Sequence, residues 1–206
     1  MATQLNIEIL RKMLTAVSET IEANVSYLNQ LDSATGDGDH GTSIVKAIRA
    51  AAKSVSDAPA GQALKEILYN VGWAVMGEDC GSTSSLIGSF FMGMSEAVTS
   101  EELDATAAIA LFESGLAGVR KQTKAKIGDK TLMDALIPAV DQMSGKSDLK
   151  SALESAAVAA AQGAESTRDY VAKFGRARNL GERSVGHIDA GATSIALIFD
   201  AFAKSV

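Results

Sequence analysis

The sequence is short of several residue types, and each shortage excludes a class of protein. Its 206 residues include one cysteine, Cys80, so no internal disulfide can form, which favours a reducing compartment. It has two prolines and 5% aromatic residues, a composition that favours long helices over many short strands. It has no uncharged run of about 18 apolar residues and no basic flank before an apolar N-terminal run. We therefore expect a cytoplasmic protein without a membrane span or a signal peptide.

Basic charge is also scarce, because 19 Lys and Arg stand against 25 Asp and Glu, a net charge of −6. Nucleic-acid binders usually present a basic face, so we expect no nucleic-acid partner. Apolar residues recur every three or four positions, the spacing of amphipathic helices, without the sustained alternation of strands. The pattern predicts eight helices, at 7–31, 42–55, 64–75, 86–98, 105–119, 131–143, 149–174 and 193–205. No linker or repeat divides the chain, so we predict a single all-α domain over residues 1–206.

Three carboxylates, three glycines and one of the two histidines gather in residues 32–41, between the first two predicted helices. Asp32, Asp37 and Asp39 would repel one another on so short a connection. A hard divalent cation offsets such repulsion, and Mg²⁺ takes carboxylate oxygens while keeping positions open for water and phosphate. Helix capping and turn formation would need one acid and not three. The loop therefore predicts a magnesium site.

Two known motifs match part of this loop, but its surroundings exclude both. Residues 36–41 satisfy the dinucleotide fingerprint GxGxxG, but that motif needs a preceding strand and amides that face pyrophosphate without carboxylates. An EF-hand beginning at Asp37 needs a glutamate at its twelfth position, where Ile48 stands.

Three further connections are rich in Gly, Ser, Thr or charge, and each leads into a helix, whose free N-terminal amides can bind anions. They are 77–85, 121–130 and 175–192. Taken singly, each has a plain alternative: a Ser-capped helix start, a helix beginning at Lys130–Thr131, and a solvated basic loop. Taken together with the acids, they describe a Mg–nucleotide site, where a protein mainly positions phosphates and neutralises charge.

Three motifs in this order resemble the nucleotide-binding L subunit of bacterial dihydroxyacetone kinases, which also forms the C-terminal domain of single-chain members. The motifs are Asp32-x4-Asp37-Gly-Asp39-His40-Gly41, Gly128-Asp129-Lys130-Thr131 and Leu180-Gly181-Glu182-Arg183-Ser184-x-Gly186-His187-x-Asp189-x-Gly191-Ala192-Thr193-Ser194. The resemblance covers essentially the whole chain. It implies an eight-helix up-and-down barrel with ADP or ATP and two Mg²⁺ ions at one end.

The same resemblance implies roles for individual residues. Asp32, Asp37 and Asp39 are the implied metal ligands, and through the metal they act in catalysis together with Arg176. The residues implied to line the nucleotide are His40, Gly41, Thr42, Ser43, Ser82, Thr83, Thr123, Leu132, Arg176, Asp189, Ala190 and Gly191.

The resemblance further implies that the γ-phosphoryl group passes to dihydroxyacetone or a related hydroxyketone held by a separate K subunit. In phosphotransferase-dependent members, a phosphohistidine on an M subunit rephosphorylates ADP in place. The chain departs from the family pattern at 80–85, where relatives carry Gly-Gly-Ala-Ser-Gly-Pro, and at Thr123, Arg178–Asn179 and Ala190. Two alternatives stay open: an ATP-dependent kinase subunit for a ketose such as erythrulose, and a non-catalytic regulatory binding protein. The chain is either a monomer or a homodimer.

Overall fold

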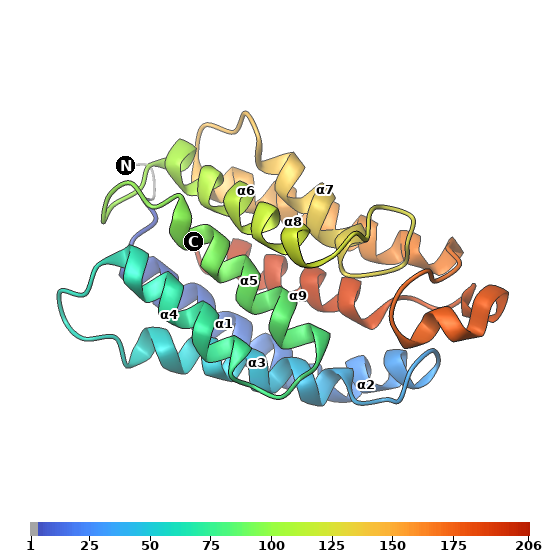
Figure 1. Ribbon diagram of the computed structural model, residues 1–206. Helices are drawn as coiled ribbons and strands as arrows, with labels where there is room; N and C mark the ends of the chain where they lie inside the picture. The colour runs from blue at the N-terminus through green and yellow to red at the C-terminus, as the bar shows by residue number, and fades with distance from the viewer. Residues whose placement is uncertain (1–3) are drawn as a thin grey trace.

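Nine α-helices make up most of the computed structural model, which describes residues 4–206 (Figure 1). They are α1 (Ile7–Ala23), α2 (Val25–Ser33), α3 (His40–Ser56), α4 (Leu64–Met76), α5 (Ser82–Glu96), α6 (Ala105–Gln122), α7 (Met133–Met143), α8 (Leu149–Ser166) and α9 (Ala190–Lys204). Within these residues the extended pairing is a single bridge between Leu5 and Leu103, and no strand forms. The all-α prediction is confirmed.

The helices close into a ring around an apolar core. From α3 onward each helix packs against the next in the chain, α1 packs against α3, and α9 packs back against α1. Helix α2 continues beyond the end of α1 and lies against α3 and α9. Counting α1 and α2 as one interrupted helix, the ring has eight members, which agrees with the predicted up-and-down barrel. None of the helices in residues 4–206 has the length and apolar character that crossing a bilayer requires.

The first predicted helix, 7–31, is wrong in one respect, because it is broken at Asn24. The Asn24 side-chain amide donates to the Thr20 carbonyl oxygen (2.8 Å), while its backbone amide turns to the Ile21 carbonyl oxygen (3.1 Å). Asparagine side chains compete with the backbone in this way and interrupt helices. A Cβ atom at Gly41 would lie 2.3 Å from the Val25 carbonyl oxygen, so the crossing of α2 and α3 requires glycine there.

The predicted helix 149–174 is also too long, because α8 ends at Ser166. Thr167 is fully buried, and its hydroxyl donates to the Ala164 carbonyl oxygen (2.6 Å) as the chain turns into the 3₁₀ helix η1, Thr167–Asp169. A second 3₁₀ segment, η2 (Arg176–Ser184), occupies half of the predicted connection 175–192. It is bent at Gly181, where φ is +55°.

The up-and-down topology gathers four connections at one end of the ring, on the right of Figure 1. They join α2 to α3, α4 to α5, α6 to α7, and α8 to α9, and they include every segment that the sequence singles out for chemistry. The connections α3–α4, α5–α6 and α7–α8 lie toward the opposite end. The fold therefore brings together segments that are up to about 150 residues apart in the sequence.

Candidate metal and nucleotide site

The α2–α3 connection is folded around one carboxylate. Oδ2 of Asp32 accepts hydrogen bonds from the backbone amides of Gly38 (2.9 Å), Asp39 (3.0 Å) and His40 (3.3 Å). A Cβ atom at Gly36 would lie 2.4 Å from the other oxygen of Asp32, so only glycine fits beside it. Three amides fix the orientation of the carboxylate.

Asp32, Asp37 and Asp39 each bring one carboxylate oxygen within 4.8 Å of those of the other two. In the part of the chain that the structure describes, this is the one group of three or more His, Cys, Asp and Glu with such geometry. Asp32 is half-buried, whereas Asp37 and Asp39 are exposed. The donor set suits Mg²⁺, which binds through a few carboxylates and leaves positions for phosphate oxygens. The residues present therefore fit the ion that the sequence predicts.

Arg176 carries a positive charge to the same acids. It opens η2, and its guanidinium pairs with Asp37 and lies 4.0 Å from a carboxylate oxygen of Asp39. Its side chain is 66% exposed, so solvent screens the pair and it adds little stability. The guanidinium and a metal ion would contact the same carboxylate oxygens. Arg176 can therefore leave the acids without disturbing the core.

His40 joins the acid loop to α9. Its Nε2 lies 2.7 Å from Oγ of Ser194, whose hydroxyl donates to the Ala190 carbonyl oxygen (3.1 Å). The hydroxyl has one proton to donate, so Nε2 carries the proton of this pair. Burial lowers the pKa of His40, and the charge of Asp32 opposes that shift only in part. His40 is therefore neutral: it links the acid loop to α9 and adds no charge to the site.

The other predicted residues at the start of α3 are engaged with neighbouring backbone or side chains. The Thr42 amide donates to Oδ1 of Asn29 (3.2 Å), and its hydroxyl accepts from Nδ2 of the same residue (3.2 Å). The Ser43 amide donates to the Asp39 carbonyl oxygen (3.0 Å). Gly41 is buried against α2. These contacts position the acid loop, and contact of these residues with a nucleotide stays a prediction.

The α4–α5 connection lies beside the acid loop. Burial raises the pKa of the Cys80 thiol, and the charge of Asp39 on the neighbouring connection adds to that rise. The N-cap of α5 is Gly81 with φ of +58°, and Ser82 is exposed at the first turn of the helix. The Thr83 amide donates to the Cys80 carbonyl oxygen (3.2 Å). An open hollow of about 480 Å³, lined by residues between Met76 and Ser85, adjoins this turn.

The α6–α7 and α8–α9 connections meet on the other side of the acids. A Cβ atom at Gly191 would lie 3.4 Å from Cβ of Leu132, so these two predicted residues are neighbours. Asp189 caps α9 by accepting the Ala192 amide (2.7 Å), and Ala190 is buried beside it. Burial raises the pKa of Asp189 to about 6. Thr123 instead ends α6, and its hydroxyl accepts the Ala125 amide (3.1 Å) within its own connection.

Sequence reasoning missed a buried polar cluster behind this junction. Lys130, which the pattern places at a helix start, is 1% exposed, and its Nζ donates to the carbonyl oxygens of Thr167 (2.5 Å) and His187. Asp134, also 1% exposed, accepts the amides of Gly128 (2.6 Å) and Thr131 (2.7 Å). One feature of the sequence could have indicated this cluster. Asp134 stands three residues after Thr131, a spacing typical of hydrogen bonds between a side chain and the nearby backbone.

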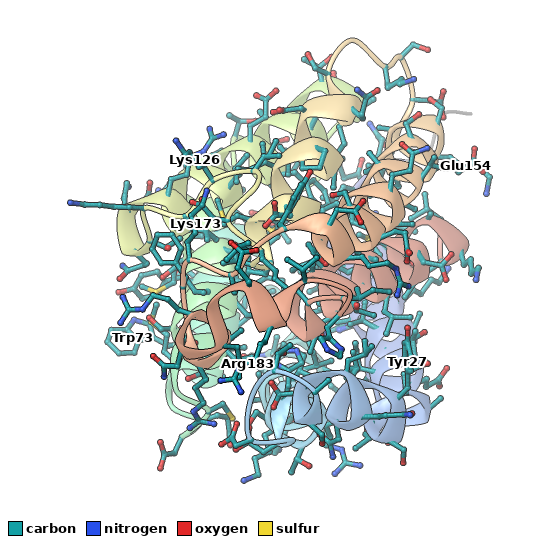
Figure 2. The ribbon with its side chains drawn as sticks, turned by 90° about the vertical axis from the view of Figure 1, so that its right-hand side faces the viewer. Tyr27, Trp73, Lys126, Glu154, Lys173 and Arg183 are labelled. Atoms are coloured by element: carbon teal, nitrogen blue, oxygen red, sulfur yellow. The ribbon has the colours of Figure 1, made fainter. Side chains whose placement is uncertain are left out.

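Figure 2 looks onto this end of the ring. The segment that carries Arg183 crosses the view between α2 below and the connection that carries Lys126 above, with Lys173 close to Lys126. The site is thus bounded by the four connections described above.

Comparison with known proteins places the chain in a family. The family described as the DAK2 domain matches residues 34–204. The chain belongs to this DAK2 family. The ADP-binding subunit DhaL of a PEP-dependent dihydroxyacetone kinase 1 from Listeria innocua is 34% identical over 94% of both chains. This membership confirms the resemblance that the three motifs indicate.

Two further similar proteins are longer than this chain. An L-erythrulose kinase of Pectobacterium atrosepticum is 34% identical over 91% of this chain, which spans 33% of that protein. A crystal structure of the dihydroxyacetone kinase from C. freundii, in complex with AMP-PNP and Mg²⁺, aligns with a TM-score of 0.75 and 24% identity. It covers all of this chain, which corresponds to 35% of that structure, and it shows that the two share a fold.

The raised pKa of Asp189 predicts a pH dependence of stability in this DAK2 chain. The folded state holds the protonated form more tightly than the unfolded state does, so this stabilisation is complete below about pH 4. It is lost as the pH rises through about 6. Asp189→Asn keeps an acceptor for the Ala192 amide but cannot ionise, so we expect it not to lose this stability as the pH rises. The difference in unfolding free energy between the variant and the parent should therefore shift in favour of the variant between pH 4 and 7, by at most about 3 kcal/mol.

Urea unfolding of both proteins in EDTA, at pH values from 4 to 7, measures this difference. Parallel pH profiles for the parent and Asp189→Asn would show that Asp189 titrates normally in the folded chain.

Proposed function

We propose that the chain is the nucleotide-binding L subunit of a dihydroxyacetone kinase. It transfers the γ-phosphoryl group of a Mg-bound nucleotide to dihydroxyacetone, or a related hydroxyketone, held by a separate K subunit. The observation that carries the proposal is the convergence of Asp32, Asp37 and Asp39 on one another, with Arg176 against them. The Listeria relative, covered almost end to end, is named an ADP-binding subunit of such a kinase.

The three aspartates would hold Mg²⁺, two ions by analogy with the family. Bound Mg²⁺ neutralises phosphate charge and so supplies the electrostatic part of phosphoryl transfer. Asp32 is pre-oriented by three amides and keeps its carboxylate in place when the cation arrives. Asp37 and Asp39 are exposed and can adjust to the phosphates. Arg176 supplies the mobile positive charge that can follow the transferred group.

The surrounding connections would bind the rest of the nucleotide. Ser82 and Thr83 open α5 and offer backbone amides and hydroxyls to phosphate oxygens. Leu132 and Gly191 offer an adjoining surface without charge. The acceptor hydroxyl belongs to the ketone on the K subunit, so no nucleophilic side chain is needed in this chain. The exposed position of the acids, at the open end of the barrel, allows that subunit to approach.

The phosphoryl donor is either a phosphorylated M subunit or ATP. We infer that ADP stays bound and is rephosphorylated by the phosphohistidine of an M subunit, because the Listeria relative is named PEP-dependent. The second candidate is an ATP-dependent kinase for a related ketose. It is favoured by the equal identity, 34%, to an L-erythrulose kinase.

Reconstitution separates these two. The purified chain is mixed with a dihydroxyacetone-loaded K subunit of the Listeria type and given either ATP or a PEP-phosphorylated M subunit. We expect sustained formation of dihydroxyacetone phosphate with the M subunit, and at most a single turnover per bound nucleotide with ATP. Full-rate turnover with ATP and erythrulose would favour the second candidate, and binding of the K subunit without transfer from either donor would contradict both.

Removing one acid tests the metal assignment. Asp37→Ala deletes an exposed ligand without touching the core, so we expect an unchanged helical circular dichroism spectrum. Affinity for ADP in the presence of Mg²⁺, measured by calorimetry, should fall about a hundredfold or more, about 3 kcal/mol. Asp57→Ala removes another exposed aspartate, at the far end of α3, and should leave the affinity unchanged. If Asp37→Ala binds Mg-ADP as tightly as the parent, Asp37 is not a ligand.

Replacing Arg176 should have opposite effects on metal binding and on transfer. Because its guanidinium contacts the carboxylates that would hold the cation, Arg176→Gln should bind Mn²⁺ without nucleotide several-fold more tightly. The rate of phosphoryl transfer should fall by about a hundredfold or more, as for other cations that stabilise the transferred group. Arg178→Gln is the matched control. Weaker Mn²⁺ binding by Arg176→Gln would contradict the competition between the guanidinium and the metal.

A further inference from the structure

Lys130 is a buried charge that the proposed mechanism does not use. We propose that Lys130 is a positioning residue whose ammonium group ties the turn before α9 to the α6–α7 connection, and so orients the Asp189–Gly191 start of α9 toward the nucleotide. The proposal rests on the proposed function for its last step, the effect on nucleotide binding. The tie itself can be tested without a nucleotide.

The tie joins three segments that are distant in sequence. Nζ of Lys130 donates to the carbonyl oxygen of Thr167, at the end of α8, and to that of His187, two residues before the α9 cap. Hydrogen bonds to a charged group are stronger than bonds between neutral groups. Both acceptors are backbone atoms, so the ammonium group fixes the path of the chain and not merely a side chain.

From Thr167 the contacts continue to Asp189. The Thr167 hydroxyl accepts the Asp189 amide (2.8 Å) and donates to the Ala164 carbonyl oxygen (2.6 Å). On the same turn the Gly186 amide donates to the Arg168 carbonyl oxygen (2.8 Å). Asp189 in turn caps α9, so a shift of this turn would move the cap and the glycine that follows it. Lys130 therefore begins a short series of contacts that leads through Thr167 to Asp189, one of the residues predicted to line the nucleotide.

Two nearby carboxylates partly balance the charge of Lys130. Burial lowers its pKa, and the carboxylates of Asp189 and Asp134 oppose this shift. Burying an ammonium group costs several kcal/mol unless it is paired and hydrogen-bonded, so a lysine here needs both acceptors and both acids. A core that served stability alone would be filled at lower cost by an apolar side chain.

The backbone of Lys130 is held in an unfavourable conformation. Its φ is +59°, and among residues 4–206 it is the one non-glycine residue with a positive φ. Such a conformation is strained and persists where the surroundings impose it, typically at functional sites. Asp134 imposes it by accepting the amides on either side, those of Gly128 and Thr131. The α6–α7 connection thus directs Lys130 inward.

Lys130→Met tests the tie, because methionine has similar length and no donor. Lys124→Met is the matched control, since Lys124 lies on the same connection as Lys130 but is exposed. In Lys130→Met, we expect amide hydrogen exchange at residues 186–191 to quicken about tenfold or more, with exchange in α8 unchanged. The Kd for Mg-ADP should rise about tenfold or more, while affinity for Mn²⁺ alone stays within about twofold. Lys124→Met should match the parent in all three.

Unchanged exchange at 186–191 in folded Lys130→Met would overturn the tie, as would uniform quickening over the whole chain, which indicates a purely structural role. Quickened local exchange with unchanged Mg-ADP affinity would overturn the orienting role. If the parent chain binds no Mg-ADP, the proposed function fails, and the exchange comparison still decides the tie.

Thr167→Val keeps the proposal testable if Lys130→Met does not fold. It removes the hydroxyl that accepts the Asp189 amide, while keeping the side-chain volume and the backbone carbonyl that accepts from Lys130. We expect quicker exchange at Asp189 and weaker Mg-ADP binding, again with unchanged Mn²⁺ affinity. A Thr167→Val protein that matches the parent in exchange and in Mg-ADP affinity would overturn the proposal.

Discussion

The candidate site depends on one carboxylate and the three backbone amides that it accepts. Without these bonds from Gly38, Asp39 and His40, the α2–α3 connection would be a flexible chain of mutually repelling acids. The amides that Asp32 binds place Asp37 and Asp39 beside it, so the three acids stay close together despite their repulsion. The close approach at Gly36 and the tight helix crossing at Gly41 follow from the same folded loop.

The ring of helices and the site have divided tasks. Helix packing buries the apolar residues and holds the four connections at one end of the barrel. The connections carry the charges: three acids with Arg176 against them, and the buried Lys130 on the α6–α7 connection. This end of the ring therefore holds two cations of different kinds. Arg176 is exposed and can move, whereas Lys130 is buried and cannot. Phosphoryl transfer needs this combination of fixed position and available charge.

Much of this arrangement could be predicted from the sequence, because it follows from local pattern. Apolar spacing predicts the helices, and the density of acids predicts that they converge on a cation. The breaks at Asn24 and Thr167 could not be predicted, because each depends on a side chain that takes a backbone acceptor in competition with the helix. Lys130 was missed because a lysine near a helix start is ordinarily solvated. Its burial follows only from the meeting of two connections, α6–α7 and α8–α9, which no local pattern records.

The most direct test of the magnesium–nucleotide site is a crystal structure of the chain with ADP and Mn²⁺, using the anomalous scattering of manganese to locate the metal. We predict anomalous peaks between the carboxylates of Asp32, Asp37 and Asp39 and the nucleotide phosphates. We also predict that Arg176 no longer pairs with Asp37. Manganese bound elsewhere, or a nucleotide bound while the Arg176–Asp37 pair stays intact, would contradict the site proposed for these residues.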